Sequence, residues 1–270
     1  MSMVRTDLHT HTRYCDGKNS PEEMVRAALD RGLACLGFSG HGTAPYDADC
    51  CMTREGAAAY RDEVAALREK YAGKLLLLCG VEQDYWSDES TADYDYVIGS
   101  VHYVNLNGEM LCVDNTPEIA AAAVERHFGG DWYAFAEAYF DTVADVAAKT
   151  GCDIIGHFDL ISKFNEKERF FDERHPRYTA AWQAAADRLL PYGLPFEINT
   201  GAMSRRWRTE AYPAAEMRDY IRRGGGKLIL SSDSHSAATL CFAFERYEHE
   251  SGLSDALDFA RSLAAGRRGK

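Results

Sequence analysis

Histidine and acidic residues follow several of the short apolar runs in this sequence. The first group is Asp7-Leu8-His9-Thr10-His11, in which alternate residues of an extended chain lie on one side. Its two imidazoles, two residues apart, can share a metal ion. The later groups contain His41, Glu82, His102, His157 with Asp159, Glu197 with Asn199, and Asp233 with His235. The pattern predicts a metal site assembled from distant parts of the chain.

The positions of the histidines support this interpretation. A single histidine more often packs or caps than binds a metal ion. His127, His175 and His249 fall in helical or loop stretches and keep that ordinary interpretation. The other six of the nine follow predicted strands: His9, His11, His41, His102, His157 and His235. A random scatter would not sort them in this way.

The donor atoms indicate which ions would bind. Imidazole nitrogen with carboxylate oxygen, and no obligatory thiolate, favours Zn, Mn or Fe over Ca or Mg. Six histidines with Asp16, Glu82 and Asp233 are too many for one ion, so we expect two or three divalent transition-metal ions. Three such ions, three carboxylates and a hydroxide leave about two positive charges, which complement a phosphate dianion. Cys15, beside Asp16, is expected to be a small apolar filler.

The elements that must position these residues alternate along the chain. Apolar runs separated by helix-like stretches indicate a parallel sheet covered by helices. In an α/β barrel, chemistry takes place at the carboxyl ends of the strands, where these polar groups fall. Seven strands are predicted: Met3–Leu8, Cys35–Ser39, Leu75–Val81, Tyr96–Val101, Asp153–Gly156, Pro195–Ile198 and Lys227–Leu230.

The intervening helices carry recognisable ends. Ser20, Pro21 and Glu23 form a capping box before Met24–Arg31, and Gly32 ends that helix. Further helices are predicted from Thr53 to Tyr71 and over Trp132–Lys149, Thr179–Leu190 and Pro213–Arg223. The long segments Asn105–Gly130 and Ile161–Arg177 are expected to be loops or extra helices over one face.

Composition limits the class of protein. The 270 residues are 46% hydrophobic, and no linker or repeat divides them, so we expect one domain over residues 1–270. Acidic residues outnumber basic ones 42 to 30, which argues against nucleic-acid binding. The sequence has no apolar leader or membrane span, and its eight cysteines lack a CxxC pair. We therefore expect a cytoplasmic protein with reduced thiols, and the oligomeric state is not predicted.

Taken in order, the groups resemble the PHP family (polymerase and histidinol phosphatase), whose motifs begin with Asp-x-His-x-His and end with Asp-x-His. The likeness covers the whole chain and is greatest to the branch of monofunctional histidinol-phosphate phosphatases. The discriminating segments are Asp95–His102, DYVIGSVH, and Gly156–Leu160, GHFDL. Supporting matches are Leu8–His11 with Cys15–Gly17, Phe38–His41 and Glu197–Thr200.

The resemblance implies an α/β fold, a distorted (β/α)7 TIM-like barrel, with a trinuclear site. One ion would be held by His9, His11, Glu82 and Asp233, a second by Asp16, His41 and His235, and a third by Glu82, His102 and His157. It also implies an enzyme of histidine biosynthesis, which hydrolyses L-histidinol phosphate to L-histidinol and phosphate. A metal-bound hydroxide would attack phosphorus, without a covalent phosphoenzyme.

Candidates for contact with this small-molecule substrate follow the later strands. Arg205, with Arg206 beside it, and Lys163 would bind the phosphate. Glu197 and Asn199 could receive the amino or imidazole group, or support the metal ligands from behind. Asp159 could protonate the leaving group. An acidic lip carrying aromatic rings would suit a cationic imidazole, and the candidate rings are Tyr85, Trp86, Tyr103 and Trp207.

Three alternatives stay open on the sequence alone. The substrate could be another phosphate monoester, such as a nucleotide, a sugar phosphate or phosphotyrosine, because selectivity lies in the loops. An amidohydrolase-like deaminase also places His-x-His after its first strand, although no Lys ends a middle strand here to form a carbamylated bridge. A non-catalytic metal-binding barrel is the third. Metal content and activity on a generic phosphate ester would separate the three.

Overall fold

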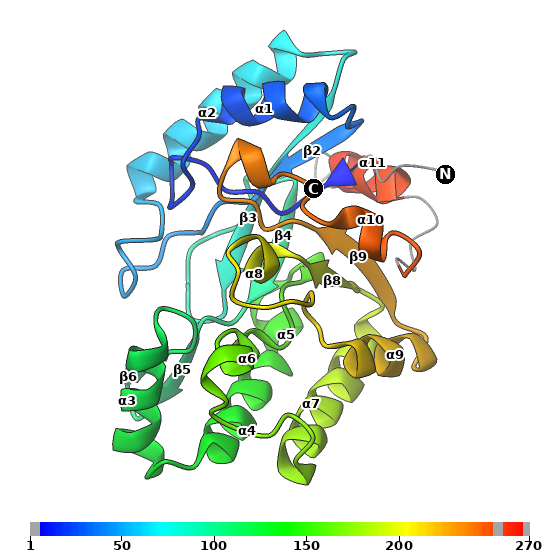
Figure 1. Ribbon diagram of the computed structural model, residues 1–270. Coiled ribbons are helices and arrows are strands. Elements are labelled where there is room, and N and C mark those ends of the chain that lie inside the picture. The colour runs from blue at the N-terminus through cyan, green and yellow to red at the C-terminus, as the bar shows by residue number, and fades with distance from the viewer. Residues whose placement is uncertain (1–5, 251–255, 267–270) are drawn as a thin grey trace.

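A nearly closed barrel of seven parallel strands forms the centre of the protein (Figure 1). The computed structural model describes residues 6–250 and 256–266. The strands adjoin in the order β1-β2-β3-β4-β7-β8-β9, and a parallel bridge between Thr10 and Ser234 joins the two outer strands just beyond their ends. Their bounds are β1 Thr6–Asp7, β2 Cys35–Phe38, β3 Leu76–Asp84, β4 Tyr96–Ser100, β7 Ile154–Ile155, β8 Pro195–Asn199 and β9 Lys227–Ser231.

Each of the seven predicted runs overlaps one of these strands, so the predicted seven-stranded α/β barrel is confirmed. Met3–Arg5, at the start of the first run, lie outside the described residues. β3 continues to Asp84, three residues beyond the predicted end at Val81. The extension pairs Glu82 with Ile98 and Asp84 with Ser100 of β4, because both strands are buried there. β3 therefore carries polar residues into the barrel mouth.

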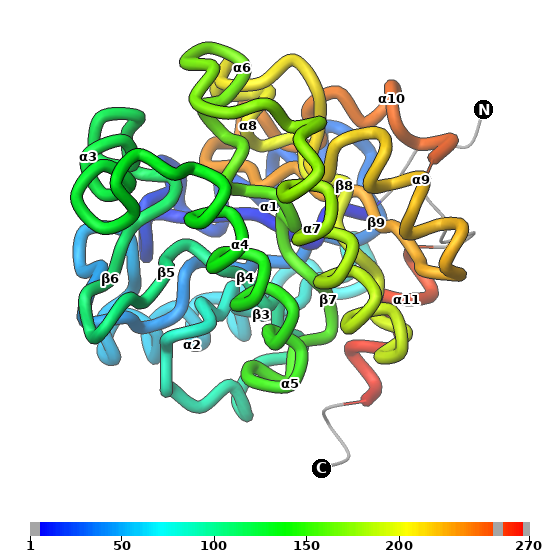
Figure 2. Tube along the Cα trace, turned by 90° about the horizontal axis from the view of Figure 1, so that it is seen from below, coloured from blue at the N-terminus to red at the C-terminus, as the bar shows by residue number. Residues whose placement is uncertain are grey.

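Helices surround the barrel, as the view in Figure 2 shows. The main ones are α1 Pro21–Asp30, α2 Arg54–Lys70, α4 Trp132–Val143, α5 Val146–Thr150, α7 Pro176–Leu189 and α9 Ala215–Arg223. The capping box predicted at Ser20 and Glu23 is present. The single helix predicted over Trp132–Lys149 is wrong, because α4 ends at Val143 and a separate short helix begins at Val146. α7 begins a turn earlier than predicted, with His175 as N-cap and Pro176 in the first turn.

A β-hairpin stands beside the barrel where only loops or helices were expected. β5 Tyr103–Leu106 and β6 Glu109–Cys112 pair antiparallel, and α3 Pro117–Phe128 follows them. Asn107 and Gly108 form the turn with φ values of 54° and 91°, the left-handed conformation that an Asn-Gly hairpin turn requires. The shorter elements are η1 Leu160–Ser162, α6 Asn165–Glu168, η2 Leu190–Tyr192, α8 Gly201–Ser204, η3 Ala237–Thr239, α10 Phe244–Tyr247 and α11 Ala256–Gly266.

Two apolar clusters hold the barrel together. The larger lies between the strands and the surrounding helices. The smaller is formed by inward-facing residues of the strands, including Leu78 and Tyr96, and α11 packs against it with Ala260 and Leu263. Gly37 lies against the Tyr96 ring, where an added Cβ would stand 2.3 Å from the hydroxyl oxygen. Among the described residues, no helix is both long and apolar enough to cross a membrane.

Candidate metal centre

Histidine and carboxylate side chains from most of the strand ends meet at the mouth of the barrel. All of them except His9 and His11 line a cavity of about 320 Å³, a size typical of small-molecule sites. His9, His11 and Asp16 follow β1, and Glu82 lies on β3. The others follow β2, β4, β7 and β9 in turn: His41, His102, His157, and Asp233 with His235. All nine predicted ligands are therefore brought to one end of the barrel.

Glu82 lies at the centre of the cluster and is 1% exposed. Its carboxylate faces five imidazoles. The distances are 3.2 Å to His9 Nε2, 3.5 Å to His11 Nε2, 3.0 Å to His41 Nδ1, 3.4 Å to His102 Nε2 and 2.9 Å to His157 Nε2. Burial alone would raise the pKa of Glu82, but His41, His9 and His102 hold it well below its usual range. A carboxylate in this position could bridge ions.

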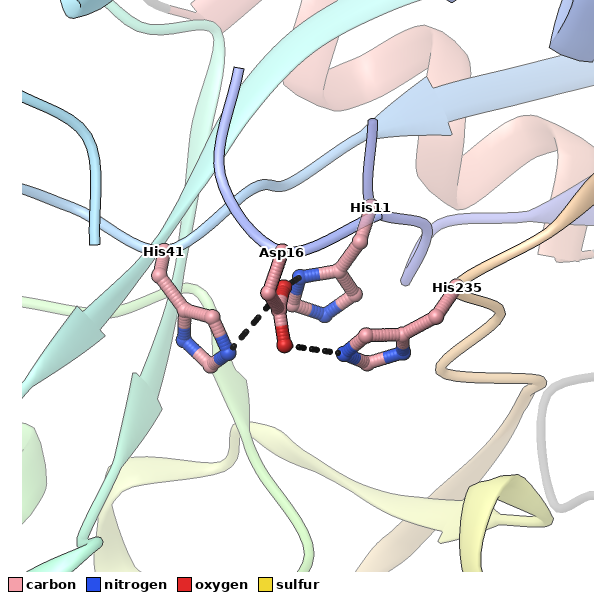
Figure 3. Close-up of side chains that lie close together, drawn as sticks. All are labelled: His11, Asp16, His41 and His235. Atoms are coloured by element: carbon pink, nitrogen blue, oxygen red, sulfur yellow. Dashed lines mark ion pairs between the residues drawn. The ribbon is translucent and has the colours of Figure 1, made fainter. Parts of the chain in front are cut away.

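Asp16 organises a second group, shown in Figure 3. Its Oδ2 lies 3.0 Å from His235 Nε2, and its Oδ1 lies 3.4 Å from His11 Nδ1 and 3.8 Å from His41 Nε2. One ligand atom from each of these four residues fits within 4.8 Å of the others. The loop that carries Asp16 is compact, since a Cβ on the next residue, Gly17, would stand 2.5 Å from Thr12 N.

Asp233 lies beside His9 and His11, the same two histidines that face Glu82. Its Oδ1 lies 3.2 Å from His11 Nε2 and 3.8 Å from His9 Nε2. Asp233 has a φ of 47°, so its backbone is in the left-handed region, which Asp tolerates better than most residues. This conformation is fixed within the mouth of the barrel, between β9 and His235.

The chemistry of the donors fits divalent ions. His9 Nε2, His11 Nε2 and Glu82 Oε2 are buried. The two nitrogens lie 3.2 and 3.5 Å from Glu82 Oε2, but among the described residues none of the three atoms forms a hydrogen bond. Buried polar atoms without a hydrogen-bond partner are rare in folded proteins unless an ion or a water molecule binds them. Burial opposes charge on His9, yet Glu197, Glu82 and Asp233 raise its pKa well above the ordinary value. The converging carboxylates require positive charge, which bound metal ions would supply.

Glu197 and Asn199 lie behind this cluster rather than in the cavity wall. Glu197 Oε1 lies 2.7 Å from His9 Nδ1, and its Oε2 accepts a hydrogen bond from His157 N at 3.0 Å. Asn199 donates to Glu197 and Asp233, and its Oδ1 accepts from Gly201 N. Both side chains are fully buried and neither lines the cavity. Of the two roles expected for these residues, the bonds favour support of the cluster from behind, where they orient the metal-binding histidines and Asp233.

Asp84 and Tyr46 support His102 in the same way, and the sequence analysis missed both. Asp84 Oδ2 lies 3.2 Å from His102 Nδ1 and accepts from His102 N at 2.9 Å. Tyr46 donates its hydroxyl to Asp84 Oδ1 at 2.5 Å. The period of two along β3 places Asp84 on the same side as Glu82, and that spacing was a signal available in the sequence.

Arg205 and Lys163 both line the cavity, as the phosphate-binding prediction requires. Arg205 Nη2 lies 3.0 Å from Asp233 Oδ2, and its Nη1 lies 2.9 Å from His235 Nδ1. Lys163 Nζ is held by Asp114, at 2.9 Å from Oδ2. Arg206, by contrast, is exposed and does not line the cavity. Arg205 is therefore the guanidinium nearest the cluster, and Lys163 is partly neutralised.

Asp159, the predicted proton donor, is fully buried and does not line the cavity. Its Oδ2 accepts hydrogen bonds from Ala214 N at 3.1 Å and from Ser162 Oγ at 3.4 Å. Its Oδ2 is therefore turned toward the loop before α9, and its role as a proton donor stays a prediction. Asp7 is also buried and accepts from Ser232 and Cys241 N, so it fastens β1 to β9 and the following loop.

Cys15 and the aromatic candidates differ in their distance from the site. Cys15 Sγ lies 3.6 Å from His11 Nδ1 and donates to Thr12 O, so it packs beside the cluster. Of the four predicted rings, Tyr103 alone is among the residues that line the cavity. Trp86 donates to Tyr103 O, and Tyr85 donates to Asp145. Trp207 packs against Phe164, away from the cavity.

Comparison with known proteins gives a consistent result. The family model described as "PHP domain" matches residues 7–201. A protein of Deinococcus radiodurans named "Probable histidinol-phosphatase" is 34% identical over 88% of this chain and 89% of its own. A solved structure of a candidate histidinol phosphatase from Listeria monocytogenes has a TM-score of 0.78 at 20% identity and covers 90% of this chain and 99% of that one.

A second solved structure has the same fold. It is a histidinol phosphate phosphatase from Lactococcus lactis, complexed with zinc, L-histidinol and phosphate. Its TM-score is 0.66 at 19% identity, and the alignment covers 98% of this chain and 94% of that chain. The alignment spans nearly the full length of both chains, so the likeness extends past residue 201, where the family match ends.

Proposed function

The chain belongs to the PHP domain family, and from this membership we propose that it is a histidinol-phosphatase: a metal-dependent enzyme that hydrolyses L-histidinol phosphate to L-histidinol and phosphate. The observation that carries the proposal is the convergence of buried histidines on Glu82 beside a cavity that also holds Arg205. The name of the Deinococcus relative supports the substrate, because that protein matches this chain over most of its length. We assign all of residues 1–270 to one such catalytic unit.

We propose that the nine clustered residues hold two or three divalent transition-metal ions, of which Zn, Mn and Fe suit the donors best. The sets are His9, His11, Glu82 and Asp233 for one ion, Asp16, His41 and His235 for a second, and Glu82, His102 and His157 for a third. The three potential ligand groups in the structure overlap these sets. His41 faces both Glu82 and Asp16, at 3.0 and 3.8 Å, and could therefore bind either the ion beside Asp16 or the ion beside Glu82.

When bound, such ions lower the pKa of a water molecule and neutralise phosphoryl oxygens. The chain's own residues orient the reactants. The Arg205 guanidinium, fixed by Asp233 and His235, is placed to bind phosphoryl oxygens as negative charge moves toward the leaving group. Glu197 holds His9 and the His157 backbone in place, and Asp84 does so for His102. In the net reaction the oxygen of water bonds to phosphorus, the P–O ester bond breaks, and one proton of that water passes to the oxygen of the leaving alcohol.

The test is phosphate release by metal-free protein and by protein reconstituted with Zn, Mn or Fe. Each sample is given L-histidinol phosphate and, separately, a nucleotide, a sugar phosphate and phosphotyrosine. We expect a strong preference for L-histidinol phosphate, no turnover after chelation, and recovery on adding metal. Comparable turnover of all esters would indicate a phosphoesterase with another substrate. Bound metal without turnover of any ester would indicate a non-catalytic barrel.

The partner of this site is a small molecule, because the candidate residues line a partly enclosed cavity rather than an extended flat surface. The absence of nucleic-acid binding and the cytoplasmic location stay predictions. Electrophoretic mobility of a labelled oligonucleotide and cell fractionation would check them, with mixing at physiological salt so that weak nonspecific binding is excluded.

A further inference from the structure

The cavity contains more carboxylates than the metal cluster uses. Asp16, Glu82 and Asp233 belong to the histidine cluster, and Asp114 forms an ion pair with Lys163 at 2.9 Å. Asp47 also lines the cavity. No described basic side chain forms an ion pair with it, so its negative charge stays uncompensated in the wall. An unpaired carboxylate in a partly enclosed site favours binding of a cation.

The loop between β2 and α2 holds Asp47 in a fixed position. Its backbone N–H donates to Ala44 O at 3.0 Å, and its carbonyl oxygen accepts from Cys51 N at 3.0 Å. The preceding residue, Tyr46, donates to Asp84 at 2.5 Å and lies edge to face against Tyr103, with ring centroids 5.2 Å apart. The loop is thus anchored to the residue that supports His102, and Asp47 is half-buried beside the cavity.

The neighbours of Asp47 in the wall are neutral. Tyr103 lies beside Asp47 in the cavity wall, where its phenol is close enough to hydrogen-bond to the Asp47 carboxylate. Burial and Asp47 together raise the pKa of Cys50 to about 12. Neither the phenol nor the thiol supplies a positive charge that would neutralise Asp47. A ligand cation at this part of the wall would meet one carboxylate and an aromatic ring, which also attracts cations.

We propose that Asp47 determines substrate specificity by binding a protonated nitrogen of the leaving alcohol while the phosphate occupies the metal end of the cavity. This inference rests on the proposed function. L-Histidinol phosphate has an ammonium group and an imidazole on the alcohol side of its ester bond, so it carries opposite charges at its two ends. One cavity wall contains both Arg205 with the metal cluster, which suit the phosphate, and Asp47 with Tyr103, which suit the cationic group.

The experiment measures kcat and KM for L-histidinol phosphate and for 3-phenylpropyl phosphate, a monoester of similar length without nitrogen. The variants are Asp47→Asn and a matched control, Asp49→Asn, which alters an exposed residue of the same loop that does not line the cavity. Loss of a hydrogen bond to a charged group predicts that Asp47→Asn lowers the preference for L-histidinol phosphate by about 10- to 100-fold, mainly through KM. Asp49→Asn keeps the wild-type preference.

Two outcomes would overturn the inference. In one, Asp47→Asn leaves the ratio of the two kcat/KM values unchanged. In the other, both esters are slowed equally, which would mean that Asp47 maintains the loop or the metal site. If Asp47→Asn does not fold, Asp47→Ser makes the same test, because serine removes the charge and still suits a turn. A wild-type protein that prefers the nitrogen-free ester would instead contradict the proposed function itself.

Discussion

The two halves of the barrel interior differ sharply in chemistry, although the same strands build both. On β3 the inward positions run from Leu78 through Gly80 to Glu82. On β4 they begin with Tyr96 and Ile98, and the same alternation leads to His102. The amino-terminal half is therefore an apolar cluster closed by α11, and the carboxyl-terminal half is a buried cluster of imidazoles and carboxylates.

The difference shows how the chain offsets the free-energy cost of burying the charged groups of the metal centre. Burying charged groups destabilises a fold unless they are paired, whereas burying apolar side chains stabilises it. Tyr96 connects the halves, since its hydroxyl donates to Leu8 O at 2.5 Å and to Phe38 O at 3.1 Å, directly before the segments that carry His9 and His41. We infer that the apolar half maintains the fold and that the polar half depends on bound metal.

The largest expected effect comes from removing a proposed ligand. His9→Ala should reduce kcat/KM for L-histidinol phosphate by more than about 100-fold and lower the metal content, because losses of up to that size follow from removing even outer partners of a ligand. The measurement is phosphate release together with metal analysis. His127→Ala is the control, since His127 pairs with Glu109 beside the hairpin. Full activity of His9→Ala would contradict the proposal that the histidine cluster of the polar half binds the catalytic metal ions.

Arg205→Ala should lower kcat/KM by about 10- to 100-fold, because a charge-assisted contact to the phosphoryl group is lost. Metal content should stay close to wild type, which separates this variant from His9→Ala. The matched control is Arg206→Ala, an exposed neighbour outside the cavity. Equal losses in the two variants would mean that general surface charge, and not the position of Arg205, matters.

Glu197→Gln should weaken metal binding by about 10-fold, at the lower end of the range for outer partners, because glutamine keeps the shape but not the charge facing His9. Activity should recover at higher metal concentration. Titration of the metal-free variant with Zn, followed by phosphate release, makes this measurement. Failure of added metal to restore activity would indicate that Glu197 has a direct part in catalysis.

The smallest effect on activity is expected in the apolar half. Leu78→Ala should lower the free energy of unfolding by about 2–5 kcal/mol, because Leu78 is 1% exposed and a cavity would remain. Metal content and kcat/KM of the folded variant should stay near wild type. Chemical denaturation measures the stability, with Ile119→Ala as control, since Ile119 is 46% exposed. Loss of bound metal in Leu78→Ala would show that the halves are coupled.

Patterns along the chain were enough to predict the barrel and the residues that gather at its mouth. Parallel strands place their carboxyl ends on one side, so a histidine or carboxylate after each strand must approach the others wherever the helices pack. The capping box at Ser20 and the apolar runs acted locally in the same way. The Asn107-Gly108 turn is also a local signal, but the expectation of loops or extra helices over Asn105–Gly130 does not include it.

Which polar residues face the cavity and which lie behind it depends on contacts between distant segments, so the fold was needed to see it. Glu197, Asn199 and Asp159 lie at or just beyond strand ends as the ligands do, yet each is turned toward a backbone or side-chain partner from a distant segment. Asp47 lies in the long connection between β2 and α2, and Asp114 lies in the short one between β6 and α3, yet both line the cavity. A strand's period fixes the side on which a residue lies, but the partners that satisfy a buried polar group come from elsewhere in the chain, and folding alone brings them together.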